Sequence, residues 1–350
     1  MKISLIKKVI EENPEIKQIY MRSRQSRSRV TSVYDVSSTC NLTCEGCLYF
    51  DKDGNYSGTL KQPSLNEYKD FFLREKARGV NYPIFSGAEA GLNQDILLVA
   101  SEIWSQGMVH TNGTIPINPC VPFRLYVSSW GHRKLTNQWR GADCYDKVLR
   151  NIIGDKRVMV NYTINRMNID DIFPVTNDCA SHNLPITFQV YSPTTDYLSK
   201  IKDNEQKKYK FIHSSTNDYN LVMHTEDNVR ACEIVKKAIR KFPDHVVFTS
   251  DLADWVFTRE GMFMNEKFDN NEPPASCDVA MDIKHRHYLN DLSVQNKKTC
   301  GHPEIECKTC RAYTSIYTSY FRHKSSLLQC SQSVKEYLSV HNVFHKIFYI

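Results

Sequence analysis

The sequence predicts an α/β fold in which six parallel strands alternate with helices to form an open or closed barrel, followed by a cysteine-rich C-terminal module. Two observations predict the barrel. From residue 33 onward, short β-rich apolar runs alternate with segments of helical apolar spacing. Three of the predicted helices also end at a glycine. Because chirality bends a series of parallel βα units into an open or closed barrel, we expect the chemistry at the carboxyl ends of its strands.

The elements are expected in a regular order along the chain. The first strand covers residues 32–37, and the first helix begins at Ser64, where Glu67 completes a capping box, and ends at Gly79. Further strands are expected over 83–85, 108–111, 123–128, 158–164 and 186–191, and further helices over 94–106, 143–153 and 169–181. Beyond these, a polar stretch over 194–228 precedes a helix at 229–242, a strand at 246–250 and a linker at 270–274.

This pattern divides the chain into four parts. Residues 1–30 are a basic arm without a clear apolar period, which we interpret as solvated, with binding of a phosphate or an acidic peptide as the alternative. Residues 31–192 are the barrel core, and residues 193–270 complete the barrel or link it onward. Residues 271–350 are the cysteine-rich module.

Composition narrows the class of protein. A hydrophobic content of 41% and a charged content of 24% are those of a globular chain, and a net charge of +6 is too weak to require a nucleic-acid partner. The N-terminus has no apolar signal region, and no apolar run reaches the ~20 residues of a membrane span. We therefore expect a cytoplasmic protein, in which cysteines stay reduced and clustered cysteines more often bind metal.

Cys40, Cys44 and Cys47 have the spacing C-x3-C-x2-C at the exit of the first predicted strand. Three thiolates on one loop can each bind one iron of a cubane cluster, which leaves the fourth iron with an open coordination position. Metal sites that perform chemistry usually require such a position. The alternatives are a zinc loop and unbonded thiols that pack as small hydrophobic groups.

With this motif the chain resembles the radical S-adenosylmethionine (SAM) superfamily, whose signature C-x3-C-x2-C follows the first strand of a partial (β/α)6 barrel. The resemblance implies that SAM chelates the open iron of a [4Fe-4S] cluster through its amino and carboxylate groups. It implies that an electron from the cluster, supplied by a low-potential donor such as flavodoxin or ferredoxin, cleaves SAM to methionine and a 5′-deoxyadenosyl radical. That radical then abstracts hydrogen from a substrate.

The resemblance extends over residues 33–192 and names a SAM site. Gly87, Ala88 and Glu89 take the place of the family's GGEP segment, which implies contact with the SAM amino group, although Ala88 and Ala90 replace a glycine and the proline. Asn112 lies in a Thr-Asn-Gly segment that many members share.

Two later segments complete the expected site. Ser128 is in the position of a residue that hydrogen-bonds the SAM ribose, while Trp130 replaces the aspartate of that motif. Asn165 and Arg166 follow the fifth predicted strand, where they are expected to contact the SAM carboxylate or ribose. An arginine fork suits a carboxylate because it binds both oxygens.

A second cysteine group consists of Cys277, Cys300, Cys307 and Cys310. Its position resembles the SPASM/twitch branch of the superfamily, which implies an auxiliary [4Fe-4S] cluster, with Cys330 as a substitute ligand. A structural zinc site that includes His302 is the alternative, because C-x2-C with two further soft ligands is also zinc spacing. Free thiols are the third interpretation.

The predicted function is therefore that of a radical SAM enzyme acting on a peptide or a small molecule. The rival is an iron–sulfur or zinc protein that binds a partner without cleaving SAM. Loss of Glu89 would favour that rival, and Glu89 is present.

Overall fold

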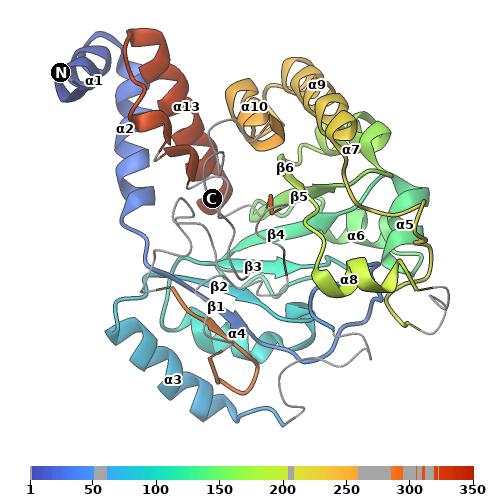
Figure 1. Cartoon of the computed structure of the whole chain (residues 1–350). Helices are drawn as coiled ribbons and strands as arrows, with labels where there is room; N and C mark the ends of the chain where they lie inside the picture. The colour runs from blue at the N-terminus through green and yellow to red at the C-terminus, as the bar shows by residue number, and fades with distance from the viewer. Residues whose placement is uncertain are drawn as a thin grey trace.

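A seven-stranded parallel sheet organises the chain (Figure 1). The computed structural model describes residues 2–50, 61–203, 209–258, 285–294, 305, 310–311, 319–321 and 323–350. The strand order is β6-β5-β4-β3-β2-β1-β7, so the first six strands pair in sequence order, as the barrel prediction requires. Their bounds are Thr31–Asp35 (β1), Tyr82–Ser86 (β2), Met108–Thr111 (β3), Arg124–Ser129 (β4), Val158–Ile164 (β5), Ile186–Val190 (β6) and His287–Tyr288 (β7).

Helices connect these strands and cover one face of the sheet (Figure 1). The predicted capping box at Ser64 is present and begins α3. Helix α4 ends at Ser101 rather than at the predicted residue 106, and α5 was not predicted. The bounds are Leu65–Ala77 (α3), Gln94–Ser101 (α4), Arg133–Arg140 (α5), Tyr145–Ile152 (α6) and Ile172–Ser181 (α7), with 3-10 turns at Ala90–Leu92 (η1) and Ile169–Asp171 (η2).

The two faces of the sheet differ in polarity because side chains alternate along each strand. On β1, the Tyr34 ring packs against Phe71 and Phe72 of α3, with ring centroids 6.0 and 5.4 Å apart. The next residue, Asp35, faces the other way and contacts His287 of β7, with Oδ1 and Nε2 2.9 Å apart. The face away from the helices is therefore the polar one.

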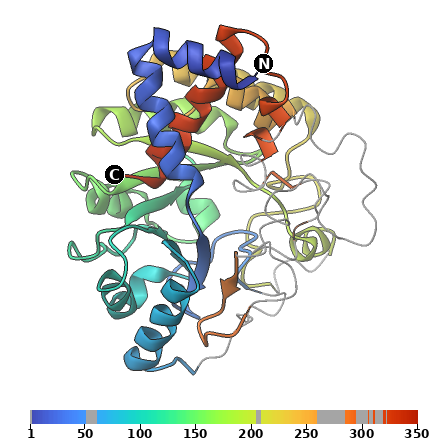
Figure 2. The ribbon, with the colours of Figure 1, turned by 90° about the vertical axis from the view of Figure 1, so that its left-hand side faces the viewer.

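The N-terminal segment is not the solvated arm that the sequence predicts. It forms α1 (Lys2–Glu12) and α2 (Pro14–Arg27), and α2 lies beside the C-terminal helix α13 (Ser331–Phe348) in both views (Figures 1 and 2). Ile16, Ile19 and Tyr20, at helical spacing, pack against the main hydrophobic core. Arg22 and Arg24, both exposed, follow this narrow apolar stripe in α2, so the segment looks polar in the sequence.

Hydrogen bonds hold the end of α13 at the amino ends of the strands. Arg124, the first residue of β4, donates hydrogen bonds to the carbonyl oxygens of Lys346 and Ile347. The Tyr82 hydroxyl of β2 donates to the Phe348 carbonyl. These bonds satisfy carbonyl groups that the last turn of a helix leaves unpaired. The opposite edge of the sheet remains for a functional site.

The chain after β6 continues as α8 (Thr195–Lys200), residues 209–224, α9 (Thr225–Lys241) and α10 (Ser250–Thr258). Helices α9 and α10 join the main hydrophobic core, whereas α8 and residues 209–222 pack with α5 in a separate hydrophobic cluster. The strand predicted at 246–250 is wrong: Val246 forms a single bridge to Ile186, and Thr249 then caps α10 by accepting from the Leu252 amide at 3.1 Å. The predicted linker at 270–274 lies outside the described residues. Among the helices that the structure describes, none is long and apolar enough to cross a membrane.

Candidate cofactor site

The three cysteines of the C-x3-C-x2-C motif lie on the loop that leaves β1, and each is half-buried. The loop turns tightly, with the Cys47 amide donating to the Cys44 carbonyl at 3.2 Å. Burial raises the pKa of the Cys40 thiol to about 11 and also raises the pKa of Cys47. Both thiols therefore need a nearby cation to ionise, and metal ligation supplies one.

A cluster and a single metal ion place different demands on the spacing of these three thiols. Within the part of the chain that the structure describes, no three His, Cys, Asp or Glu side chains converge closely enough to hold a single ion. A zinc ion requires its sulfur ligands at about 2.3 Å from one centre. A cubane cluster instead takes one thiolate for each iron, which separates the ligands.

Glu89 joins the loops that follow β2 and β3. Its Oε1 accepts hydrogen bonds from the Gly91 amide at 2.8 Å and the Thr111 hydroxyl at 2.5 Å, and its Oε2 accepts from the Asn112 amide at 2.7 Å. The side chain is buried, and this burial raises the pKa of Glu89 in spite of the three donors. A carboxylate has about four lone-pair positions, so one stays available for a further donor.

Asn112 connects this carboxylate to the cysteine loop. Its Nδ2 donates to Asn41 Oδ1 at 2.8 Å and lies 3.7 Å from Cys40 Sγ. Its Oδ1 accepts from the Thr114 amide at 2.9 Å. The structure therefore brings Cys40, Asn112 and Glu89, which are far apart in the sequence, into one network of contacts.

The Gly87-Ala88 turn is compatible with the residues present. Gly87 has φ +82°, and a Cβ there would lie 2.4 Å from Asp35 Cβ, so only glycine fits. Ala88 does not have a positive φ, so alanine in place of the second glycine of the family motif introduces no backbone strain.

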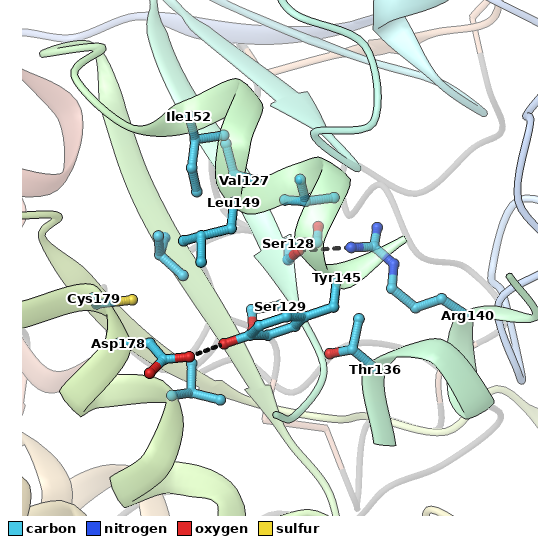
Figure 3. Close-up of a pocket in the computed structure, with 13 residues that line it drawn as sticks. Val127, Ser128, Ser129, Thr136, Arg140, Tyr145, Leu149, Ile152, Asp178 and Cys179 are labelled. Atoms are coloured by element: carbon cyan, nitrogen blue, oxygen red, sulfur yellow. Dashed lines mark hydrogen bonds between the residues drawn. The ribbon is translucent and has the colours of Figure 1, made fainter. Parts of the chain in front are cut away.

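Arg140 is a site residue that the sequence did not reveal. It is the last residue of α5 and only 2% exposed, and its Nη1 donates to the carbonyls of Ser128 at 2.8 Å (Figure 3) and Asn112 at 3.3 Å. Burial lowers the pKa of an arginine, but electrostatic interaction with Cys44, Cys144 and Glu89 outweighs burial and raises the pKa of Arg140. Its Nε has no hydrogen-bond partner in the described structure. A buried cation with a free N–H therefore lies beside the cysteine loop.

The other predicted SAM contacts have different surroundings. Ser128 is half-buried at the end of β4. Asn165 is fully buried after β5, where its Oδ1 accepts from the Met167 amide at 2.9 Å while its Nδ2 has no partner among the described residues. Arg166 contacts other groups: its Nη1 donates to the Asp218 carbonyl at 3.3 Å, and its Nε lies 3.9 Å from Asp227 Oδ2. Arg166 is therefore already paired with α9 and the segment before it.

A small pocket of about 40 Å³ lies behind β4, between the sheet and helices α6 and α7 (Figure 3). Its lining surface is almost entirely apolar, with Val127, Val148 and Leu149 among its residues, although Ser128 and Arg140 also border it. SAM carries an ammonium, a carboxylate, a sulfonium and two hydroxyls, which an apolar lining does not satisfy. We therefore do not assign SAM to this pocket.

Most of the second cysteine group lies outside the part of the chain that the structure describes. Cys277, Cys300 and Cys307 lie outside the described residues, and Cys310 is half-buried. The Arg311 amide donates to Ser192 Oγ at 2.9 Å, so Cys310 lies near the carboxyl end of β6. Cys330 is exposed at the start of α13. The auxiliary cluster, the zinc alternative with His302 and the free thiols all remain predictions.

Comparison with known proteins gives a structural likeness. No family model and no curated protein matches the sequence. Crystal structures of SuiB from Streptococcus suis match at 13–16% identity: the complex with S-adenosylmethionine has a TM-score of 0.53, and SuiB alone and its complex with the precursor peptide SuiA both have 0.52. The match to the S-adenosylmethionine complex covers 78% of this chain and 60% of SuiB, so the chain spans about three-fifths of the SuiB length. At this identity the likeness shows the fold alone: the chain shares the α/β fold of SuiB, and its first six parallel strands pair in the order that the sequence predicts.

Proposed function

We propose that this protein is a radical SAM enzyme in which Cys40, Cys44 and Cys47 hold a [4Fe-4S] cluster. When bound, the cluster supplies the electron that cleaves SAM and so yields a 5′-deoxyadenosyl radical. The observation that carries the proposal is the network around the cysteine loop, in which Asn112 links Cys40 to Glu89 and its carbonyl accepts a hydrogen bond from Arg140. The network includes a carboxylate, that of Glu89, and a guanidinium, that of Arg140, near the thiols. The amino acid end of SAM carries an ammonium and a carboxylate, which such groups bind through charge-assisted hydrogen bonds.

The residues of the network have complementary roles in this proposal. The guanidinium of Arg140 binds the SAM carboxylate through its unused N–H, because a buried arginine is always charged and presents a planar fork. Glu89 accepts a hydrogen bond from the SAM ammonium with its remaining lone pair. Asn165 offers its unpaired Nδ2 to the carboxylate or ribose, and Ser128 its hydroxyl to the ribose. Gly87 and Ala88 let the backbone approach SAM closely.

We further propose that the substrate is a peptide. SuiB, which shares this fold, was crystallised with a precursor peptide. The polar face of β5 is also suited to peptide groups: Asn161 and Thr163 lie on it, and Asn161 Oδ1 is buried without a partner among the described residues. Unpaired amide groups of this kind can bond the backbone of an extended peptide. A low-potential donor such as flavodoxin or ferredoxin supplies the electron.

An anaerobic assay tests the SAM-cleaving activity. Protein reconstituted with iron and sulfide is mixed with SAM and dithionite, and 5′-deoxyadenosine is quantified. We expect formation by the wild type and by Cys120→Ala, a control that removes an exposed thiol, and none by Cys44→Ala. A wild type that binds a cluster but forms no 5′-deoxyadenosine would favour the rival function, an iron–sulfur protein without SAM cleavage. Addition of a peptide fraction from cell extract, with mass spectrometry of the peptides, then tests the substrate class.

A further inference from the structure

Glu45 lies between two of the cluster cysteines, yet its carboxylate binds a distant part of the chain. It is fully buried. Its Oε2 accepts from the amides of His213 at 3.0 Å and Ser214 at 3.1 Å, and its Oε1 accepts from the amide of Ser215 at 3.0 Å. Three consecutive backbone donors around one carboxylate form a strong, charge-assisted contact.

The imidazole of His213 adds a second connection between the same two segments. Its Nδ1 lies 3.1 Å from Glu45 Oε2, and its Nε2 lies 2.9 Å from the Thr43 carbonyl. The ring therefore contacts the cysteine loop at two points, one on each side of Cys44.

Backbone hydrogen bonds also join the cysteine loop to the segment before His213 and to α5. The Gly46 amide donates to the Phe211 carbonyl at 2.9 Å, and the Glu45 amide donates to the Trp139 carbonyl at 2.8 Å. A Cβ on Gly46 would lie 2.3 Å from the Tyr191 hydroxyl oxygen, so the chain that follows β6 packs closely against the cysteine loop.

A separate hydrophobic core supports these contacts. It is distinct from the main core of the barrel and combines α5 with the chain after β6. Its buried members are Trp139, Tyr197, Ile201, Ile212 and Leu221. The residues that bind Glu45 therefore directly follow Ile212, a member of this core, and are not part of an isolated loop.

We propose that Glu45 is a positioning residue that clamps residues 211–215 over the cysteine loop and so restricts access of solvent to the cluster. This inference rests on the proposed function, since it assumes a cluster on Cys40, Cys44 and Cys47. Exclusion of water and oxidants matters for a cluster because solvent exposure affects its potential and survival. The contacts of Glu45 with residues 213–215 join protein atoms only, so the clamp also predicts a consequence in the metal-free protein.

Glu45→Gln tests the clamp at nearly constant volume. A glutamine can direct its oxygen to only one side, so its NH2 group must face at least one of the three backbone N–H donors. Loss of one such bond to a charged acceptor corresponds to a roughly tenfold or larger change in local opening. The matched control is Glu75→Gln, which removes another buried carboxylate, one bonded to Tyr34, Tyr288 and Arg78 between β1 and α3.

Two readouts separate positioning from general stability. In metal-free protein, hydrogen exchange at the amides of residues 213–215 is expected to be at least about tenfold faster in Glu45→Gln and unchanged in Glu75→Gln. In reconstituted protein under anaerobic conditions, a ferrous-iron chelator is expected to remove iron faster from Glu45→Gln than from either wild type or Glu75→Gln. If Glu45→Gln does not fold, His213→Ala is the second variant, and we expect smaller changes in the same direction.

The outcomes distinguish this proposal from the proposed function. If wild type retains no cluster, the proposed function fails, and the shielding role fails with it. If wild type retains a cluster and Glu45→Gln loses iron no faster than Glu75→Gln, the clamp is overturned while the proposed function stands. Unchanged exchange at residues 213–215 in the metal-free variant also overturns the clamp.

Discussion

Replacement of Arg140 by lysine separates the two arginines that are candidates for binding the SAM carboxylate. Lysine keeps the positive charge but lacks the planar guanidinium with its several N–H donors. It therefore cannot bond the carbonyls of Ser128 and Asn112 and at the same time bond a ligand in the geometry that arginine allows. Loss of one hydrogen bond that involves a charged group costs about 1.5–3 kcal/mol. Because total stability is typically about 5–15 kcal/mol, the variant should remain folded.

The assays measure folding and binding separately. Urea unfolding of the metal-free Arg140→Lys variant should show the loss of about 1.5–3 kcal/mol in the free energy of unfolding. Anaerobic titration of the reconstituted variant with SAM should give a dissociation constant at least about tenfold weaker than that of wild type, the factor that about 1.4 kcal/mol represents.

Arg166→Lys is the control, because the sequence predicts a SAM contact for Arg166 and the structure pairs it elsewhere. Its side chain is 36% exposed and lies 3.9 Å from Asp227. An exposed pair of this kind contributes about 0–1 kcal/mol, so we expect little change in either assay. Unchanged SAM binding by Arg140→Lys, or an equal loss in Arg166→Lys, would refute the assignment of the carboxylate to Arg140.

Two further predictions concern stability. In urea unfolding, Gly87→Ala should lower the free energy of unfolding by roughly 3 kcal/mol or more, because residue 87 has φ +82° and the new Cβ would lie 2.4 Å from Asp35 Cβ. The control Gly154→Ala has a similar φ of +81° but open space around the new Cβ, so it should lower that free energy by only about 1–2 kcal/mol. Burial raises the pKa of Glu75, but hydrogen bonds from Arg78 and two tyrosines outweigh it and lower the pKa overall. A carboxyl group with a lowered pKa stabilises the folded state at pH values above its unfolded pKa of about 4.3. This stabilisation is lost as the pH falls through the pKa of the folded state. Thermal unfolding of Glu75→Gln should therefore depend less on pH below about 4.3 than that of wild type, and equal pH dependence would contradict this reasoning.

The strands of the barrel were predictable because their local signals agree with their environment. The run at 158–164 forms β5 over the same residues, since it pairs on both sides with other strands of the sheet. The apolar run at 246–250 carries a similar signal but makes one bridge and then enters α10. Partners that only the fold supplies decided between the two outcomes.

Long-range contacts account for what the sequence did not reveal. The cysteine spacing and Glu89 were visible because each lies in a short motif. The sequence assigned no role to Arg140 or Glu45, since their contacts depend on the carbonyls and amides that the fold brings to them. The packing of α2 was concealed for a related reason, because its partner α13 lies at the other end of the chain.

The central claim is that the cluster on Cys40, Cys44 and Cys47 has an open iron that SAM occupies. Electron paramagnetic resonance of the dithionite-reduced protein, with SAM labelled with ¹⁵N at its amino group and ¹⁷O at its carboxylate, tests it most directly. We predict that SAM changes the spectrum of the reduced cluster and that hyperfine coupling to both labels appears, with this signal absent from Cys44→Ala. A reduced-cluster spectrum that SAM leaves unchanged, without coupling to either label, would contradict the claim.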